Sequence, residues 1–324
     1  MLVQIILLIL GFILLIKGAD IFVNSCVGIA KKLKIPSFII ALTIVAMGTS
    51  APEFVITVTA SINGHNALAL GNIVGANIFN LMFIIGLCAI IKTIPVKVNE
   101  VSKDFLLSIA AAAFLLALKF LGGDYIPRFG SLILVVAFGV YLFLLIRKAI
   151  KAKDGNAIDE ADSSDALDSS SSAPKLRPMP LLILFAVFGC ALIIAGGHLT
   201  VESATQIATT MGISERVIGL TVIAIGTSLP ELIISLVACK KGENEFALGN
   251  IIGSNIFNIM FVLGVAGLIS PLAIEGGLIF DTIFLVVGSI IALIFVYSRK
   301  RITRIEGIIM VALYLGYMAF AIFQ

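Results

Sequence analysis

Charged side chains are scarce in this sequence. Only 13% of its 324 residues are Asp, Glu, Lys or Arg, whereas a soluble domain carries about 25%. Hydrophobic residues make up 60% of the chain, and the mean hydropathy is +1.16. This composition excludes an ordinary soluble domain and predicts an all-α polytopic membrane protein. Its expected surroundings are the lipid bilayer, with no nucleic-acid partner and no obligate protein partner, so a monomer is sufficient.

Residues that bind soft metals or act as nucleophiles are also few. The chain has two histidines and four cysteines, and none of them has the spacing of a metal site. The cysteines lie in or beside apolar runs, which predicts buried free thiols. Zinc and copper sites are therefore disfavoured. No nucleophile and base are arranged as in an enzyme, so we expect neither enzymatic activity nor a cofactor.

Ten apolar runs are long enough to cross a bilayer as helices. They cover residues 2–29, 36–62, 67–91, 104–121, 126–148, 179–209, 214–239, 245–270, 278–297 and 304–323. The first run lacks the basic start and cleavage site of a signal peptide, so we expect it to be retained. The pattern predicts a first transmembrane repeat at 1–148, a disordered acidic and serine-rich linker at 149–178, and a second repeat at 179–324.

Two motifs occur twice with the same spacing. The sequence GTSAPE at 48–53 returns as GTSLPE at 226–231, and GNIVGANIFN at 71–80 returns as GNIIGSNIFN at 249–258. Both pairs are 178 residues apart, and they differ at one and two positions respectively. The chain is therefore predicted to be an internal duplication.

Basic residues gather on one side of the predicted membrane. Of the 22 Lys and Arg residues, 18 lie in the loops that follow odd-numbered runs, which include the central linker. The positive-inside rule then predicts a protein of the plasma membrane with a cytoplasmic linker and both termini outside. Because each half has five spans, the second half enters from the opposite side, which predicts two inverted repeats.

The motif GTS-x-PE falls near the middle of its run in each half. A proline removes a backbone donor there, and a glutamate places a carboxylate where charge is expensive. We therefore expect both helices to be broken at the membrane centre and carbonyls to be freed one turn earlier. Asn80 and Asn258 also fall near span centres. The candidate ligands are Thr49, Ser50, Glu53, Asn80 and the Ala46 carbonyl, with Thr227, Ser228, Glu231, Ser254, Asn258 and the Ala224 carbonyl.

Every candidate ligand offers oxygen, which suits hard cations such as calcium and sodium. Two carboxylates supply two negative charges, and one divalent cation or several monovalent cations can neutralise them. Competition of two ions for one alternately exposed site is antiport. A passive channel would not need a duplicated centre that carboxylates block.

The repeated motifs resemble the two α-repeats of the calcium:cation antiporter superfamily, and are most similar to those of prokaryotic sodium/calcium exchangers. The resemblance covers nearly the whole chain. It implies that Glu53 and Glu231 bind calcium and share sodium, and that the Thr, Ser and carbonyl oxygens complete the sites. It also implies that the first and sixth spans slide as a gating pair across a rigid bundle.

Two positions depart from the family pattern. Ala76 stands where its repeat mate is Ser254 and where relatives commonly carry serine, so one hydroxyl for a sodium site is missing. Asn258 stands where the potassium-dependent branch carries aspartate, so potassium co-transport is not expected. Sodium/calcium antiport is the leading hypothesis, and proton/calcium antiport on the same scaffold is the alternative.

Other polar positions have simpler interpretations. Lys17 lies three residues from Asp20 in the first run, and Asp20 aligns with His198 in the sixth. We expect a paired or snorkelling group there. The glycines of the second motif, Gly71, Gly75, Gly249 and Gly253, are expected to permit close helix packing.

Overall fold

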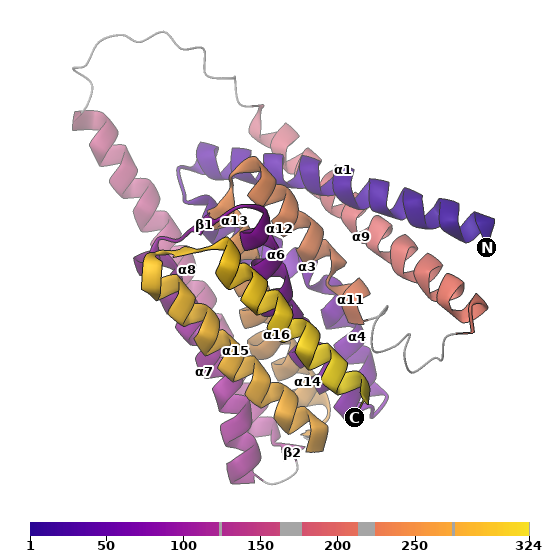
Figure 1. The fold of residues 1–324 in the computed structure, drawn as a ribbon. Coiled ribbons are helices and arrows are strands. Elements are labelled where there is room, and N and C mark those ends of the chain that lie inside the picture. The colour runs from indigo at the N-terminus through magenta and orange to yellow at the C-terminus, as the bar shows by residue number, and fades with distance from the viewer. Residues whose placement is uncertain (123–124, 163–176, 213–223, 274–275, 324) are drawn as a thin grey trace.

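The described part of the chain is almost entirely helical (Figure 1). The computed structural model describes residues 1–122, 125–162, 177–212, 224–273 and 276–323. The elements of the first half are α1 (Leu2–Leu33), α2 (Ser37–Ile40), η1 (Ala41–Val45), α3 (Ala46–Thr49), α4 (Ala51–Ile62), α5 (Asn66–Ile78), η2 (Phe79–Ile84), α6 (Ile85–Ile91), β1 (Ile94–Pro95), α7 (Val98–Gly122), β2 (Tyr125–Ile126) and α8 (Arg128–Asp162). Those of the second half are α9 (Met179–Thr210), α11 (Ala224–Thr227), α12 (Leu229–Lys241), α13 (Asn244–Ile256), η4 (Phe257–Val262), α14 (Leu263–Ile269), β3 (Leu272–Ala273), α15 (Gly276–Arg299), β4 (Arg301–Ile302) and α16 (Arg304–Phe323).

Eight helices in the described residues are long and apolar enough to cross a membrane. A ninth span results if the bent pair Ser37–Thr49 and Ala51–Ile62 is counted as one. These nine match the expected runs apart from the seventh, 214–239, which lies partly outside the described residues and continues as α11 and α12. The helical, multiply spanning fold is confirmed, and the count of ten spans stays a prediction.

The fifth span continues beyond its expected end. Helix α8 extends to Asp162 and so covers the first part of the segment 149–178, where we expected disorder. Alanine and lysine follow one another closely after residue 148, and both are strong helix formers. Residues 163–176 of that segment lie outside the described part of the chain.

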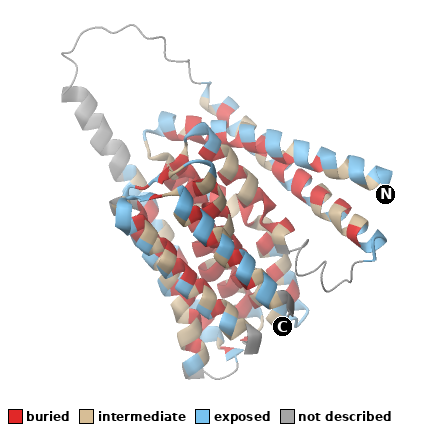
Figure 2. Ribbon diagram, in the orientation of Figure 1, coloured by how far each residue is buried: buried red, intermediate tan, exposed pale blue. Residues whose placement is uncertain are grey.

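The most buried spans run through the centre of the bundle (Figure 2). The most apolar stretches of Asn66–Ile91 and Asn244–Ile269 are 78% and 83% buried, against 22% for those of α1 and α9. Each central span contains a π-helical turn, η2 or η4, which begins at the last two residues of the repeated motif 71–80 or 249–258. Such turns are frequent at functional sites, where they turn side chains away from regular α-helical spacing.

Helices α1 and α9 lie side by side and tilt away from the remaining helices (Figure 1). They meet at two pairs of glycines. A Cβ atom added at Gly18 would lie 2.9 Å from the carbonyl oxygen of Gly189 on α9, and one added at Gly11 would lie 3.0 Å from that of Gly196. The opposing residues are Gly189 and Gly196, at which a Cβ atom would lie 2.8 Å from the carbonyl oxygens of Gly18 and Gly11 respectively. Only glycine permits backbones to approach so closely. The pairing in the order 11 with 196 and 18 with 189 shows that the two helices are antiparallel.

Two short strand pairs join the halves of the chain. Strand β1 pairs antiparallel with β4, so that Ile94 lies opposite Ile302. Strand β2 pairs antiparallel with β3, so that Ile126 lies opposite Leu272. All four of these side chains are fully or almost fully buried. Each pair therefore closes an end of the bundle with one strand from before the segment 149–178 and one from after it.

Candidate functional site

A helix break lies at the repeated motif in each half. Helices α3 and α4 meet at Ser50, with φ −84° and ψ 11°, and the two parts of this span are bent by 47°. Helices α11 and α12 meet at Ser228, with φ −91° and ψ 10°. The breaks expected from the prolines are present, and each falls two residues before its proline.

Each break places a glutamate in the first turn of the next helix. Pro52 and Pro230 are the second residues of α4 and α12, where a missing N–H is tolerated because the first N–H groups have no acceptor within their own helix. Glu53 and Glu231 follow directly, and both are 0% exposed. The positive end of the helix dipole favours a carboxylate at this position. The chain therefore brings two buried acids to the start of two helices.

Each glutamate is held by a hydroxyl from the other half of the chain. Ser50 Oγ donates a hydrogen bond to Glu231 Oε1 at 2.9 Å, and Ser228 Oγ donates to Glu53 Oε1 at 3.0 Å. These two contacts are equivalent under the offset of 178 residues. The two motifs therefore form one site, in which each half of the chain completes the other.

Further hydroxyl groups surround Glu231. Ser254 Oγ lies 3.5 Å from Glu231 Oε1 and 3.4 Å from Thr49 Oγ1, and Thr49 Oγ1 also lies 3.4 Å from Asn250 Oδ1. The residue at the position equivalent to Ser254 in the first half is Ala76, which is buried and has no hydroxyl. The surroundings of the two acids therefore differ by the oxygen that the sequence already showed to be missing. Thr227, the repeat mate of Thr49, is buried as well.

The Ala46 carbonyl is not freed by the helix break. It accepts hydrogen bonds from the Ser50 backbone N–H at 3.0 Å and from Thr49 Oγ1 at 3.1 Å. The carbonyl that loses its helical donor to Pro52 belongs to Gly48, four residues earlier. These two hydrogen bonds use both lone pairs of the oxygen. The Ala46 carbonyl could therefore bind a cation only if the Thr49 hydroxyl turned its hydrogen to another acceptor. Ala224 is the first residue of α11 and stands at the edge of the described residues.

Four asparagines link the central spans. Asn80 Nδ2 donates to Asn255 Oδ1 at 3.2 Å, and Asn258 Nδ2 donates to Asn77 Oδ1 at 3.1 Å. Asn77 and Asn255 also donate to each other's backbone carbonyls, at 3.1 and 3.3 Å. Sequence reasoning found Asn80 and Asn258 but missed Asn77 and Asn255. Their place in the repeated motif was the available signal.

Four buried oxygens at this centre have no hydrogen-bond partner within the described residues. They are Glu53 Oε2, Glu231 Oε2, Asn80 Oδ1 and Asn258 Oδ1. A buried acceptor without a partner is costly. Two carboxylate and two amide oxygens of this kind are a donor set that suits a hard cation. No three His, Cys, Asp or Glu side chains in the described ranges are close enough to hold a metal, so the charge of the site comes from these two acids.

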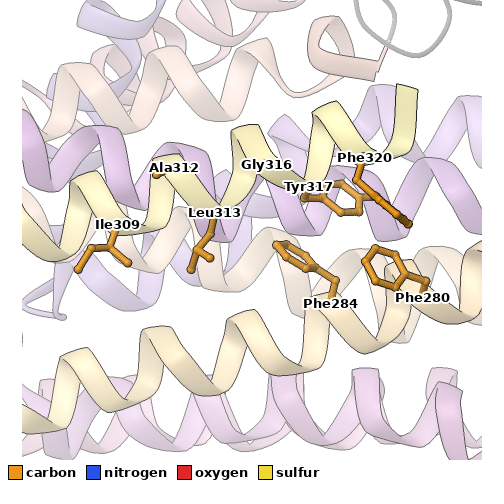
Figure 3. A pocket seen from close by; sticks show the side chains of 8 residues that line it. All are labelled: Phe280, Phe284, Ile309, Ala312, Leu313, Gly316, Tyr317 and Phe320. Atoms are coloured by element: carbon orange, nitrogen blue, oxygen red, sulfur yellow. The ribbon is translucent and has the colours of Figure 1, made fainter. Parts of the chain in front are cut away.

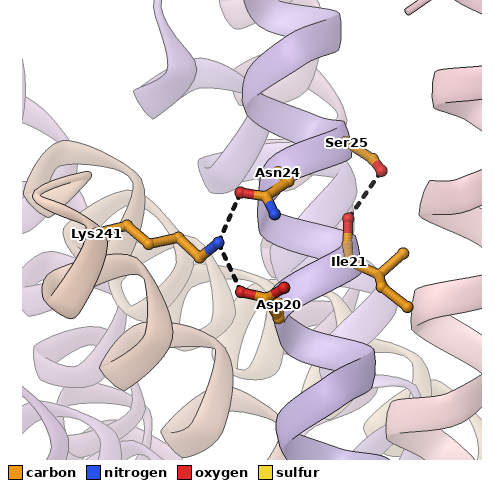
Figure 4. Close-up of polar contacts among 5 residues, drawn as sticks. All are labelled: Asp20, Ile21, Asn24, Ser25 and Lys241. Carbon is orange, nitrogen blue, oxygen red and sulfur yellow. Dashed lines mark hydrogen bonds and ion pairs between the residues drawn. The ribbon is translucent and has the colours of Figure 1, made fainter.

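Asp20 pairs with Lys241, which is much farther from it in the sequence than Lys17. Lys241 Nζ, at the end of α12, lies 2.7 Å from Asp20 Oδ1 and donates to Asn24 Oδ1 at 2.6 Å (Figure 4). This contact ties α1 to the bundle. His198 and Glu202 on α9 are both exposed, with Nε2 and Oε2 3.9 Å apart. None of these contacts reaches Glu53 or Glu231.

A hollow between α15 and α16 has neither glutamate among its lining residues (Figure 3). Its volume is about 500 Å³, and its walls include Phe280, Phe284, Leu313 and Phe320. Tyr317 also lines it, and its Oη donates to Asp281 Oδ1 at 3.0 Å. An apolar hollow on membrane-spanning helices is suited to hydrocarbon and has no ligands for an ion.

Known proteins resemble this chain over nearly its whole length. The family model described as "Sodium/calcium exchanger protein" matches residues 3–147 and 181–323. A putative antiporter, CaxA, from Alkalimonas amylolytica is 38% identical over 98% of both chains. The sodium/calcium exchanger MaX1 from Methanosarcina acetivorans is 33% identical over 98% of this chain and 97% of its own.

A solved structure of the sodium-calcium exchanger NCX_Mj has the same fold. It superposes with a TM-score of 0.82 at 30% identity, and the match covers 100% of this chain and 99% of that one. That crystal was soaked without sodium and calcium, and others of the same exchanger were soaked with sodium and either calcium or strontium.

Proposed function

Because the chain belongs to the sodium/calcium exchanger family, we propose that it is a secondary active antiporter that exchanges calcium for sodium by alternating access. The family is one of membrane antiporters, which agrees with the expected class of transporter rather than enzyme. The observation that carries the proposal is the reciprocal pair of buried glutamates, each held by a serine of the opposite half.

The four oxygens without partners are the proposed calcium ligands. Glu53 and Glu231 supply the charge, and the amide oxygens of Asn80 and Asn258 supply neutral ligands. Calcium takes six to eight oxygens at about 2.3–2.6 Å. The remaining ligands would come from Thr49, Ser50, Thr227, Ser228, Ser254 and the carbonyls of Ala46 and Ala224. Cation binding would then satisfy the acceptors that have no hydrogen-bond partner within the described residues.

Charge balance connects the two transported ions. The centre carries two negative charges when both glutamates are ionised, and one calcium ion neutralises them. Sodium ions neutralise the same carboxylates and so compete with calcium for them. An empty centre of charge −2 inside a membrane is costly, which favours a cycle in which one ion leaves only as the other enters.

Proton/calcium antiport is the second candidate, and Ala76 favours it. Ser254 offers Glu231 a hydroxyl within 3.5 Å, and Ala76 cannot offer Glu53 the same. Fewer neutral oxygens weaken a sodium site, whereas a proton on the carboxylate needs no further ligand. The two candidates therefore differ in the ion that occupies the glutamates when calcium is absent.

The same proposal includes the arrangement in the membrane. Two five-span repeats at 1–148 and 179–324 would be inverted relative to each other, with the linker 149–178 in the cytoplasm, both termini outside, and a single chain in the plasma membrane as the working unit. The reciprocal contacts of Ser50 and Ser228, and the two strand pairs between halves, agree with such a symmetry.

Calcium uptake into proteoliposomes tests the function. Vesicles loaded with sodium are compared with vesicles that carry only a pH gradient. Uptake that requires the sodium gradient and responds to membrane potential is the expected result. Uptake driven by the pH gradient alone would replace sodium with protons, and no calcium uptake under either gradient would overturn the proposal.

A further inference from the structure

Two buried asparagines beside the carboxylates have no assigned role. Asn77 at the end of α5 and Asn255 at the end of α13 are 0% and 1% exposed. Each makes two hydrogen bonds, one to a backbone carbonyl and one to the side chain of another asparagine. None of their contacts is to Glu53 or Glu231. They contact two of the proposed ligands, Asn80 and Asn258, and are not proposed ligands themselves.

The hydrogen bonds determine how each amide is oriented. A backbone carbonyl can only accept, so the Asn77 group that faces the Asn255 carbonyl must be the NH2 group. Its Oδ1 then accepts from Asn258, and the group of Asn258 that contacts it must be Nδ2. Asn258 Oδ1 is therefore the atom left without a partner. The same steps from Asn255 leave Asn80 Oδ1 without a partner.

We propose that Asn77 and Asn255 are positioning residues that hold the amides of Asn258 and Asn80 with their oxygens available to the transported cation. This inference rests on the proposed function, because it assumes that a cation binds at the glutamates. The NH2 group of an amide has no lone pair for a cation. An amide turned the other way would offer hydrogens to the carboxylates and compete with the cation for them.

The symmetry of the contacts supports a role in orientation. Each positioning residue acts on an asparagine of the opposite half: Asn77 on Asn258, and Asn255 on Asn80. Each half keeps both of its amides, although the residue before the first of them is Ala76 in one half and Ser254 in the other. The arrangement also predicts what an aspartate would do. A carboxylate offers oxygen in either orientation, so a site with aspartate at position 258 would no longer need Asn77.

That difference gives a sharp experiment. Calcium affinity of the purified full-length protein is measured by titration for the wild type, Asn77→Ala, Asn258→Asp and the double variant, with thermal stability recorded for each. Asn66→Ala is the matched control, because Asn66 also lies on α5 and donates across to the other half, to Ser270 Oγ at 2.9 Å. It lies eleven residues from Asn77, or about 16 Å along the helix.

The expected result depends on the residue at position 258. Asn77→Ala should weaken calcium binding about tenfold in the wild-type background, which is the effect of losing one hydrogen bond that favours the charged complex. In the Asn258→Asp background the same substitution should change the calcium affinity by less than about twofold, since a carboxylate at position 258 presents an oxygen in either orientation. Asn66→Ala should leave the affinity unchanged.

Three results would overturn the inference. One is unchanged affinity in Asn77→Ala, and another is an equal loss in both backgrounds, which would show that Asn77 only supports packing. If Asn258→Asp does not fold, Asn255→Ala with Asn80→Asp forms the equivalent cycle. The third result is a wild type that does not bind calcium, which would overturn the proposed function itself. Wild-type binding combined with a failed cycle would reject the positioning role alone.

Discussion

A methyl group at the contact between α1 and α9 should separate the two helices. The Cβ of an alanine at position 18 would lie 2.9 Å from the Gly189 carbonyl oxygen, 2.9 Å from Leu192 Cβ and 3.0 Å from the Ile193 backbone nitrogen. Two of these three atoms belong to the backbone and cannot swing aside. To restore a contact of about 3.5 Å the helices must part by about 0.6 Å. Overpacking of this kind costs about 1–3 kcal/mol.

Thermal unfolding of Gly18→Ala in detergent measures this cost. The matched control is Gly139→Ala on α8, because its Cβ would meet no atom within 4 Å. An alanine there should be neutral or stabilising by about 0.5–1 kcal/mol, since glycine weakens a helix interior. The variant Gly18→Ala should therefore unfold at a clearly lower temperature than the control.

The reciprocal geometry adds a second expectation. A Cβ atom added at Gly189 would lie 2.8 Å from the Gly18 carbonyl oxygen. The substitutions Gly18→Ala and Gly189→Ala therefore push the same two backbones apart. Once the helices have parted for one methyl group, the second meets less resistance, and the double variant Gly18→Ala/Gly189→Ala should lose less stability than the sum of the two. If Gly18→Ala were as stable as Gly139→Ala, the close approach of α1 and α9 would be refuted.

Two further predictions concern the symmetry of the site and the topology. Ser50→Ala and Ser228→Ala should weaken calcium binding to a similar extent, because their hydrogen bonds to the glutamates are equivalent. A hydrogen bond to a charged group contributes about 1.5–3 kcal/mol. A large difference in calcium affinity between the two variants would contradict the reciprocal arrangement. Protease added to the cytoplasmic side of membrane vesicles should cut within residues 149–178, and cleavage only from the opposite side would reverse the proposed orientation.

The sequence predicted the parts of the site that depend on local chemistry. A proline preceded by two hydroxyl residues in an apolar run predicted the break, which the structure places at Ser50 and at Ser228. The constant offset of the motifs predicted that both halves take part. These features follow from one stretch of chain and its copy, so no knowledge of helix packing was needed.

The contacts between helices could not be predicted in the same way. Which serine holds which glutamate depends on how α4 and α12 approach each other. The pairing of Asn77 with Asn255 depends in the same way on α5 and α13. Asp20 shows the same limit, because its partner Lys241 is far away in the sequence while the nearer Lys17 does not pair with it. The glycine contacts of α1 and α9 were missed because Gly11 and Gly18 lie outside the two repeated motifs.

Calcium binding to glutamine variants tests the central claim most directly. Glu53→Gln and Glu231→Gln each remove one of the two charges and keep the shape of the side chain. Asp281→Asn is the control, because this half-buried acid on α15 accepts a hydrogen bond from Tyr317 on α16 and is not among the proposed ligands. Each glutamine variant should fold as the wild type does and lose calcium binding, while Asp281→Asn keeps it. Wild-type calcium affinity in either Glu53→Gln or Glu231→Gln would contradict the account.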